Sequence, residues 1–227
     1  NIKILFSPLI AAGSVSRDER NAVLEKVEDE VCEMVLDNNR AQSRMVSYDV
    51  MRSGSDPWRY ARTMQHLAAE IPFDPEAFSM PTEEEIGNRF RRGEGLFKCE
   101  AAVLGSHAKM LAYRELLADE PLPEELVRDM VSAYIPASIR EVAGEGALDG
   151  HLLRREIATT MVVNRIVDNA GASFFPEVQA ATGRTLRNVA AAYLQAVSFG
   201  GAETVLEDLY ALEDKHRQRV VYEAMGK

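Results

Sequence analysis

A cluster of charged side chains just before an apolar helix is the part of this sequence best suited to chemistry. Residues 151–156 contain a histidine, two arginines and a glutamate, and an apolar helical pattern follows without a break until Gly171. Asn164 falls within that pattern at the spacing of its apolar neighbours, so it is predicted to lie on a packed face. A buried amide and buried charges must be hydrogen-bonded. The sequence therefore favours a polar network that closes one end of a helical bundle, and a ligand or partner contact is the alternative.

A second candidate is Lys109, which lies in a predicted helix that is apolar over much of its circumference. A buried lysine can have a lowered pKa and take part in catalysis. The favoured alternative is a lysine whose ammonium group reaches the surface or pairs with an acid across the bundle. The candidate structural network thus comprises His151, Arg154, Arg155, Glu156, Asn164 and Lys109.

Signatures of catalysis or cofactor binding are weak. Gly93-Glu94-Gly95 and Gly144-Glu145-Gly146 lack the strand, the third glycine and the downstream acid of a dinucleotide-binding turn. The single Glu-x-x-His element, Glu213 to His216, has no second copy to complete a di-metal site. His66, His107 and His151 lie far apart in the chain. We therefore expect no catalytic, cofactor-binding or metal-binding residue in this chain, and no bound NAD.

Composition limits the class of protein. A net charge of −10 disfavours nucleic-acid binding, and the absence of a basic recognition helix disfavours a helix-turn-helix regulator. The basic groups near Arg89 and Lys215 are interpreted as solvated helical faces. Cys32 and Cys99 form no CxxC pair, which indicates half-buried, unreactive thiols in a reducing, cytoplasmic compartment. No run of 18 apolar residues is present, so no membrane segment is expected. The first residue is Asn, which is more typical of an excised or proteolytic piece than of a natural start.

The elements that must position these residues are all predicted to be helices. We expect an all-α bundle of about nine to eleven helices with no sheet. Capping boxes at Ser16/Glu19 and Thr82/Glu85, and Asp56 before Pro57, mark helix starts. The helix from Ser16 is expected to extend as far as residue 51, a central helix to span about 149–169, and a last amphipathic helix to follow a break at 200–201. Residues 1–15 are assigned to a leading segment and 16–227 to a helical domain, and the proline-rich stretch at 72–81 is a candidate connector between two sub-bundles.

Several stretches carry a resemblance to a known family. They are His151 to Thr159 with Asn164, Ala170 to Phe174, Leu104 to Leu117, Tyr134-Ile135-Pro136 and Arg20 to Asn39, in that family's order. Together they resemble the C-terminal region of the large bacterial NAD-specific glutamate dehydrogenases, and Asn1 to Leu5 resembles the segment after the dehydrogenase core. The family has a lysine where this chain has Lys109. It has Thr-Arg-Pro-Glu where this chain has Phe97 to Glu100, which puts the start of that helix in doubt.

The resemblance implies a role within a larger enzyme. The parent would oxidise L-glutamate to 2-oxoglutarate and ammonia with NAD, as a homo-oligomer of longer chains. This chain would support the catalytic core or subunit contacts without being catalytic alone. Its apolar N-terminal residues, with Met45, Val46, Val50, Met51 and Trp58, are candidate contact surfaces, although core packing is the default interpretation. The alternative is an autonomous helical interaction or scaffold module without enzymatic activity.

Overall fold

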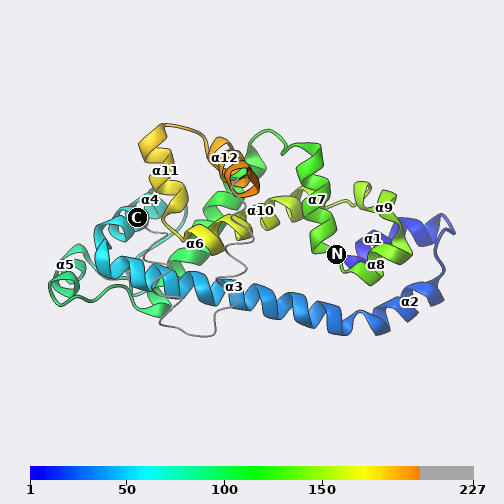
Figure 1. Ribbon diagram of the computed structural model, residues 1–227, viewed down its shortest axis with the longest axis horizontal. Helices are drawn as coiled ribbons and strands as arrows, with labels where there is room; N and C mark the ends of the chain where they lie inside the picture. The colour runs from blue at the N-terminus through cyan, green and yellow to red at the C-terminus, as the bar shows by residue number, and fades with distance from the viewer. Residues whose placement is uncertain (200–227) are drawn as a thin grey trace. The chain divides into compact units, whose positions relative to one another are not determined.

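The computed structural model describes residues 1–199, and within them every regular element is a helix (Figure 1). The all-α prediction is confirmed, with twelve helices in the described part, one above the expected range. The helices are α1 (Ile2–Ala11), α2 (Arg17–Lys26), α3 (Glu28–Ser55), α4 (Pro57–Glu70), α5 (Glu83–Arg91), α6 (Lys98–Ala118), α7 (Glu124–Tyr134), α8 (Ala137–Ala143), α9 (Glu145–Asp149), α10 (Arg154–Ala170), α11 (Phe174–Thr182) and α12 (Leu186–Phe199).

Local chemistry at the helix ends follows the predicted signals. Ser16 and Glu19 form a reciprocal capping box at the start of α2, and Thr82 and Glu85 form another at α5. The Asp56 carboxylate accepts the Arg59 N–H at the start of α4, where Pro57 occupies the first turn. Such caps satisfy amide groups that have no partner inside the helix. The ends of these helices are therefore set by the local sequence.

Two helix boundaries differ from the prediction. The expected helix from Ser16 is broken at Val27, a buried residue that ends α2, and α3 starts anew at Glu28. Three acids at positions 28–30 occupy the first turn of α3, where the helix dipole favours negative charge. The central helix begins at Arg154, later than expected, because Gly150 and His151 separate it from the short α9. The expected last helix, with Glu213 and His216, lies outside the described residues.

The chain divides into two compact units, each built from two separate stretches of sequence. Among the described residues, the first comprises 1–41 and 116–165, and the second 42–115 and 166–199. In the first unit, α1 packs on α8 and α9, and α2 packs on α8. Its core is mostly aliphatic, with Leu5, Phe6, Val131, Ile135, Ile139 and Leu148 almost completely buried.

In the second unit, α4 packs on α5 and α11, and α11 packs on α12. Its core is formed by side chains from α4, α5 and α6, including Tyr60, Leu67, Ile86, Leu104 and Leu111. The proline-rich stretch at 72–81 belongs to this unit, where Phe73 and Met80 are buried. No helix of the described part is long and apolar enough to cross a membrane.

Three predicted burial states were wrong. Core packing was the default interpretation of Trp58, but its side chain is 44% exposed, because Tyr60, Ala61, Met64 and Leu67 define the buried face of α4. Cys32 and Cys99 were expected to be half-buried, and both thiols are free and exposed. A solvent-exposed thiol has no packing contact to protect it, so both cysteines are accessible to reagents.

Candidate functional site

His151 joins the N-terminal residue to the start of α10 in the first unit. Its Nδ1 accepts the Leu153 N–H at 3.0 Å, and its Nε2 lies 3.3 Å from the Asn1 carbonyl oxygen. The tautomer with its proton on Nε2 fits both contacts, because its Nδ1 accepts and its Nε2 donates to the Asn1 carbonyl oxygen. The ring is buried at 3% exposure. His151 is thus held by backbone groups on both sides, as a structural histidine is.

The two arginines that follow make separate contacts in the same unit. Arg154 binds the Glu124 carboxylate through two bonds of 2.6 and 2.9 Å, both in a partly exposed setting. Arg155 donates to the carbonyl oxygens of Leu117 and Asp119 at 2.7 Å each. These carbonyls lie at the C-terminal end of α6, where unpaired carbonyl groups and the helix dipole favour a cation. Arg155 therefore caps a helix.

The remaining first-unit candidates make fewer polar contacts. Glu156 is half-buried, and its backbone carbonyl accepts the Thr160 hydroxyl at 2.8 Å. Asn164 is also half-buried. No hydrogen bond between described residues involves the Asn164 side chain. The described geometry thus distributes His151, Arg154 and Arg155 over three different sets of partners, and it links none of them to Asn164.

Lys109 lies in the second unit and forms an ion pair. Its Nζ is 2.6 Å from Asp168 Oδ1, with side-chain exposures of 17% and 7%. Burial raises the pKa of the Asp168 carboxyl, and the positive charge of Lys109 opposes that rise. Lys109 therefore pairs with an acid across the helices, from α6 to α10, and its ammonium group does not simply extend to the surface. Asp168 was not singled out in the sequence, since one acid in a helix gives no sign of its partner.

A buried carboxylate on α3, which the sequence did not single out, holds two other parts of the second unit. Asp49 is completely buried, and it accepts the Tyr60 hydroxyl at 2.8 Å and the Ala172 N–H at 2.9 Å. Gly171, at φ +89°, lies so close to the carboxylate that a Cβ there would collide with it. Burial raises the pKa of Asp49 to about 6, although both hydrogen bonds lower it. Met45, Asp49 and Ser53 share the buried side of α3 at four-residue spacing, and this was the available signal.

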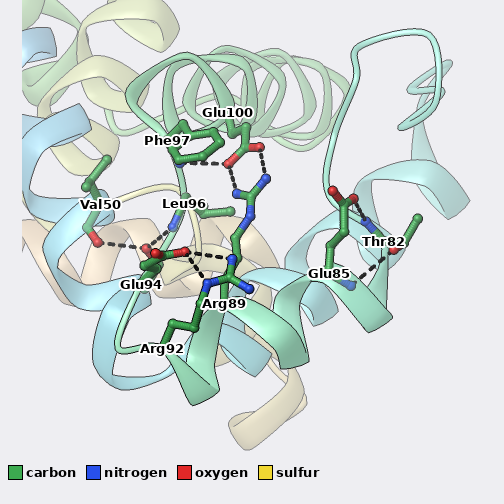
Figure 2. A network of polar contacts seen from close by, with 10 residues as sticks. Val50, Thr82, Glu85, Arg89, Arg92, Glu94, Leu96, Phe97 and Glu100 are labelled. Carbon is green, nitrogen blue, oxygen red and sulfur yellow. Dashed lines mark hydrogen bonds and ion pairs between the residues drawn. The ribbon is translucent and has the colours of Figure 1, made fainter.

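A second buried charge joins α5 to α6 (Figure 2). The Arg89 guanidinium forms two bonds to Glu100, at 2.7 and 3.0 Å, and lies 4.2 Å from the centre of the Phe97 ring. Glu100 is 5% exposed, and its Oε2 also accepts the Phe97 N–H at 2.7 Å. The interpretation of Arg89 as part of a solvated face was therefore wrong. The Glu100 carboxylate caps the start of α6, and Lys98 is the first residue of that helix even without a threonine cap.

Gly95, beside this network, serves close packing. A Cβ on Gly95 would lie 2.7 Å from the Gly54 nitrogen and 2.8 Å from the Val50 carbonyl oxygen. The Ser53 hydroxyl donates to that carbonyl at 2.7 Å and accepts the Leu96 N–H at 2.7 Å, as Figure 2 shows between the labelled Val50 and Leu96. Only glycine allows this approach. Gly95 is thus a close contact between the turn at 92–97 and the end of α3.

Comparison with known proteins decides the family. Residues 93–227 match the family model described as glutamate dehydrogenase, C-terminal, and residues 1–49 match that of the bacterial NAD-glutamate dehydrogenase catalytic domain. The chain belongs to the bacterial NAD-specific glutamate dehydrogenase family.

Three similar curated proteins are named NAD-specific glutamate dehydrogenase. The one from Pseudomonas aeruginosa is 35% identical over 86% of this chain, and the one from Mycobacterium tuberculosis is 36% identical over 77%. The one from Halomonas elongata is 29% identical over 99% of this chain. The matched regions are 11% to 14% of the length of these relatives. The resemblance to the C-terminal region of this family is therefore confirmed.

The NAD cofactor of the family can be tested against the described residues. A dinucleotide site needs a strand, a glycine-rich turn and a helix that presents its N-terminus to the pyrophosphate. Residues 1–199 contain helices and no strand, and Gly95 is used in packing. The described residues do not fit a dinucleotide. Within the same residues, no group of three or more His, Cys, Asp or Glu side chains could hold a metal ion.

Proposed function

We propose that this chain is a C-terminal helical domain of an NAD-dependent glutamate dehydrogenase, with a structural role. The whole enzyme would convert L-glutamate, NAD⁺ and water into 2-oxoglutarate, ammonium, NADH and a proton. Residues outside this chain would bind the dinucleotide and carry the chemistry. The chain itself would support the catalytic core in a homo-oligomeric, cytoplasmic enzyme.

One observation carries this proposal beyond family membership: charged groups that could do chemistry are already engaged in helix contacts. Arg155 caps α6, Lys109 pairs with Asp168, and Glu100 binds both Arg89 and the Phe97 amide. A catalytic acid, base or anion-binding group needs a free face toward its substrate. These side chains instead fix the positions of helices, which is the role of a supporting domain.

The experiment compares the longer enzyme with residues 1–227 alone. We expect NADH formation from L-glutamate and NAD⁺ by the longer enzyme, and none by the shorter chain. Calorimetry should detect NAD⁺ binding only to the longer enzyme. Glutamate-dependent NADH formation, or micromolar NAD⁺ binding, by residues 1–227 would contradict the structural role. A longer protein without glutamate oxidation would favour the alternative of a helical interaction module.

A further inference from the structure

The N-terminal half of α3 exposes apolar side chains that nothing in its own unit covers. Val31, Val35 and Leu36 are 36%, 51% and 45% exposed, and the Cys32 thiol is free and exposed. Successive residues of an α-helix are rotated by about 100°, so these four side chains fall within roughly 140° of the helix circumference. They form one continuous stripe, which we call the α3 stripe (Val31, Cys32, Val35 and Leu36).

The other side of the same helix is polar. Arg40 lies 2.7 Å from Asp37 and 4.0 Å from Glu33, so these three residues form an exposed ion-pair group opposite the α3 stripe. Exposed pairs of this kind contribute little stability, on the order of 0–1 kcal/mol each. They keep the polar side of the helix compatible with water, but they do not explain why the apolar residues gather on the other side.

The side of this part of α3 that faces the rest of the first unit carries the half-buried Glu30 and Met34. Glu30, Glu33 and Met34 line an open groove of about 520 Å³ together with Ile135 and Pro136 at the junction of α7 and α8. Glu30 also accepts the Ser138 N–H at 3.3 Å. A helix at the surface of a self-sufficient domain turns its apolar side inward and its charged side to water. In this part of α3, the α3 stripe is instead turned away from its own unit.

We propose that the α3 stripe is a docking site for the catalytic domain of the same enzyme; this inference rests on the proposed function. The catalytic-domain family model matches residues 1–49, and so it includes the stripe. The matched regions are only 11% to 14% of the relatives' length, so those enzymes hold ample chain to cover it. A helix without tertiary contacts is marginal in water, and burial of an apolar side supplies most of its stability.

The residues around the stripe define the chemistry of its partner. Leu36 lies next to the acidic side of the helix, where Glu33 and Asp37 are exposed, and the chain as a whole carries a charge of −10. The complementary surface is therefore apolar at its centre, with lysine or arginine at the edge that meets Glu33 and Asp37. Complementary charge at the rim would orient the docking, while the apolar contact would supply the affinity.

Cys32 allows a direct test, because it lies within the stripe and its thiol can be labelled. The labelling rate of Cys32 is measured by peptide mass spectrometry in residues 1–227 alone and in the longer enzyme, and Cys99 shows in both that the reagent is active. We expect Cys32 to react at least about tenfold more slowly in the longer enzyme, since labelling then requires local opening. Equal rates in the two proteins would overturn the docking site, even if the longer enzyme oxidised glutamate normally.

Other occupants give different results. Slow labelling of Cys32 in residues 1–227 alone would mean that the chain covers its own stripe, or that a second copy does, and either result would contradict the proposal. Dilution separates these two cases, because it dissociates a second copy and speeds the labelling of Cys32, whereas coverage by the same chain does not depend on concentration. Failure of the longer enzyme to oxidise glutamate would instead reject the proposed function. NADH formation measures this separately from the labelling of Cys32.

Substitutions provide a second measurement in the longer enzyme. Val35→Glu and Leu36→Glu should restore fast Cys32 labelling and increase amide hydrogen exchange across residues 31–40. The matched control is Leu152→Glu, at an exposed leucine of the same unit that is 82% exposed and lies outside the stripe. All three variants should leave the unfolding of residues 1–227 alone unchanged. Unaltered Cys32 labelling in both stripe variants would count against docking at this face.

Discussion

The two units of this chain use charge in different ways. In the second unit, the carboxylates of Asp49, Glu100 and Asp168 are at most 9% exposed, and each accepts hydrogen bonds or an ion pair from another part of the unit. In the first unit, the ion pairs of Arg154 with Glu124 and of Arg128 with Asp149 lie at the surface. The aliphatic core of the first unit contains no comparable buried ion pair among the described residues.

This contrast shows what holds each unit together. A buried charge with its partner removed costs several kcal/mol, whereas an exposed pair is nearly neutral. The second unit should therefore be sensitive to single polar substitutions, because buried carboxylates fix its helix ends. The first unit should depend on its aliphatic packing and on whatever covers the α3 stripe. Four substitutions test this difference, from the largest expected effect to the smallest.

Removal of Glu100 should have the largest effect. Glu100→Ala leaves the Arg89 guanidinium without its carboxylate and the Phe97 N–H without its cap, and should lower the free energy of unfolding by about 3–5 kcal/mol. Chemical denaturation measures this change. Glu94→Ala is the matched control, because Glu94 pairs with Arg92 at the surface and its removal should leave the free energy of unfolding almost unchanged. Equal losses in both variants would contradict the distinction between buried and exposed pairs.

Asp49 should make the second unit less stable as the pH rises. Its folded pKa of about 6 lies above the ordinary value of 3.8, so the folded state holds this proton more tightly than the unfolded chain does. The resulting stability is fully present below pH 3.8 and is lost as the pH rises through 6. It amounts to about 3 kcal/mol, since one pKa unit corresponds to roughly 1.4 kcal/mol.

The measurement compares the wild type with Asp49→Asn between pH 4 and pH 7, because other titrating groups cancel in the difference. The neutral asparagine keeps an oxygen for the Ala172 N–H and cannot ionise. The free energy of unfolding of the wild type should fall relative to that of the variant as the pH rises. A difference that stays constant, or that changes in the opposite direction, would show that Asp49 is ionised without cost.

Gly171→Ala should be destabilising for two reasons that a control can separate. The backbone at Gly171 has φ +89°, which disfavours any side chain, and its Cβ would collide with the Asp49 carboxylate. Gly183→Ala also places a Cβ at positive φ, +65°, but has nothing within 4 Å. We expect a loss of about 1 kcal/mol at Gly183 and about 2–4 kcal/mol at Gly171, measured by thermal unfolding. Equal losses would mean that the close approach to Asp49 carries no cost.

The same residues show which features of the fold could be predicted from the sequence. The caps at Ser16, Thr82 and Asp56 were predicted correctly because each depends on residues within one helical turn. The contact of Asp49 with Ala172 joins positions 123 residues apart. No local pattern specifies such a pair, because its partners meet only after the helices have packed.

The same limit applies to burial. Arg89 lies in a run of basic residues, and its neighbours Arg91 and Arg92 are indeed exposed, so composition alone favoured a solvated face. Its pairing with Glu100 follows from the turn at 92–97, which brings the end of α5 to the start of α6. In the first unit, the charged cluster after His151 was recognised from its composition. The separate partners of Arg154 and Arg155 were not, because they lie on α7 and at the end of α6.

Asn164→Leu should have the smallest effect, and it tests the sequence-based network directly. A buried, hydrogen-bonded amide would make this substitution cost about 1–3 kcal/mol, since its partners would be left unsatisfied. Asn164 is half-buried, and its side chain makes no hydrogen bond to another described residue. The free energy of unfolding should therefore change by less than about 0.5 kcal/mol. A larger loss in chemical denaturation would show that the first unit also contains a buried polar network, and the contrast between the two units would then no longer hold.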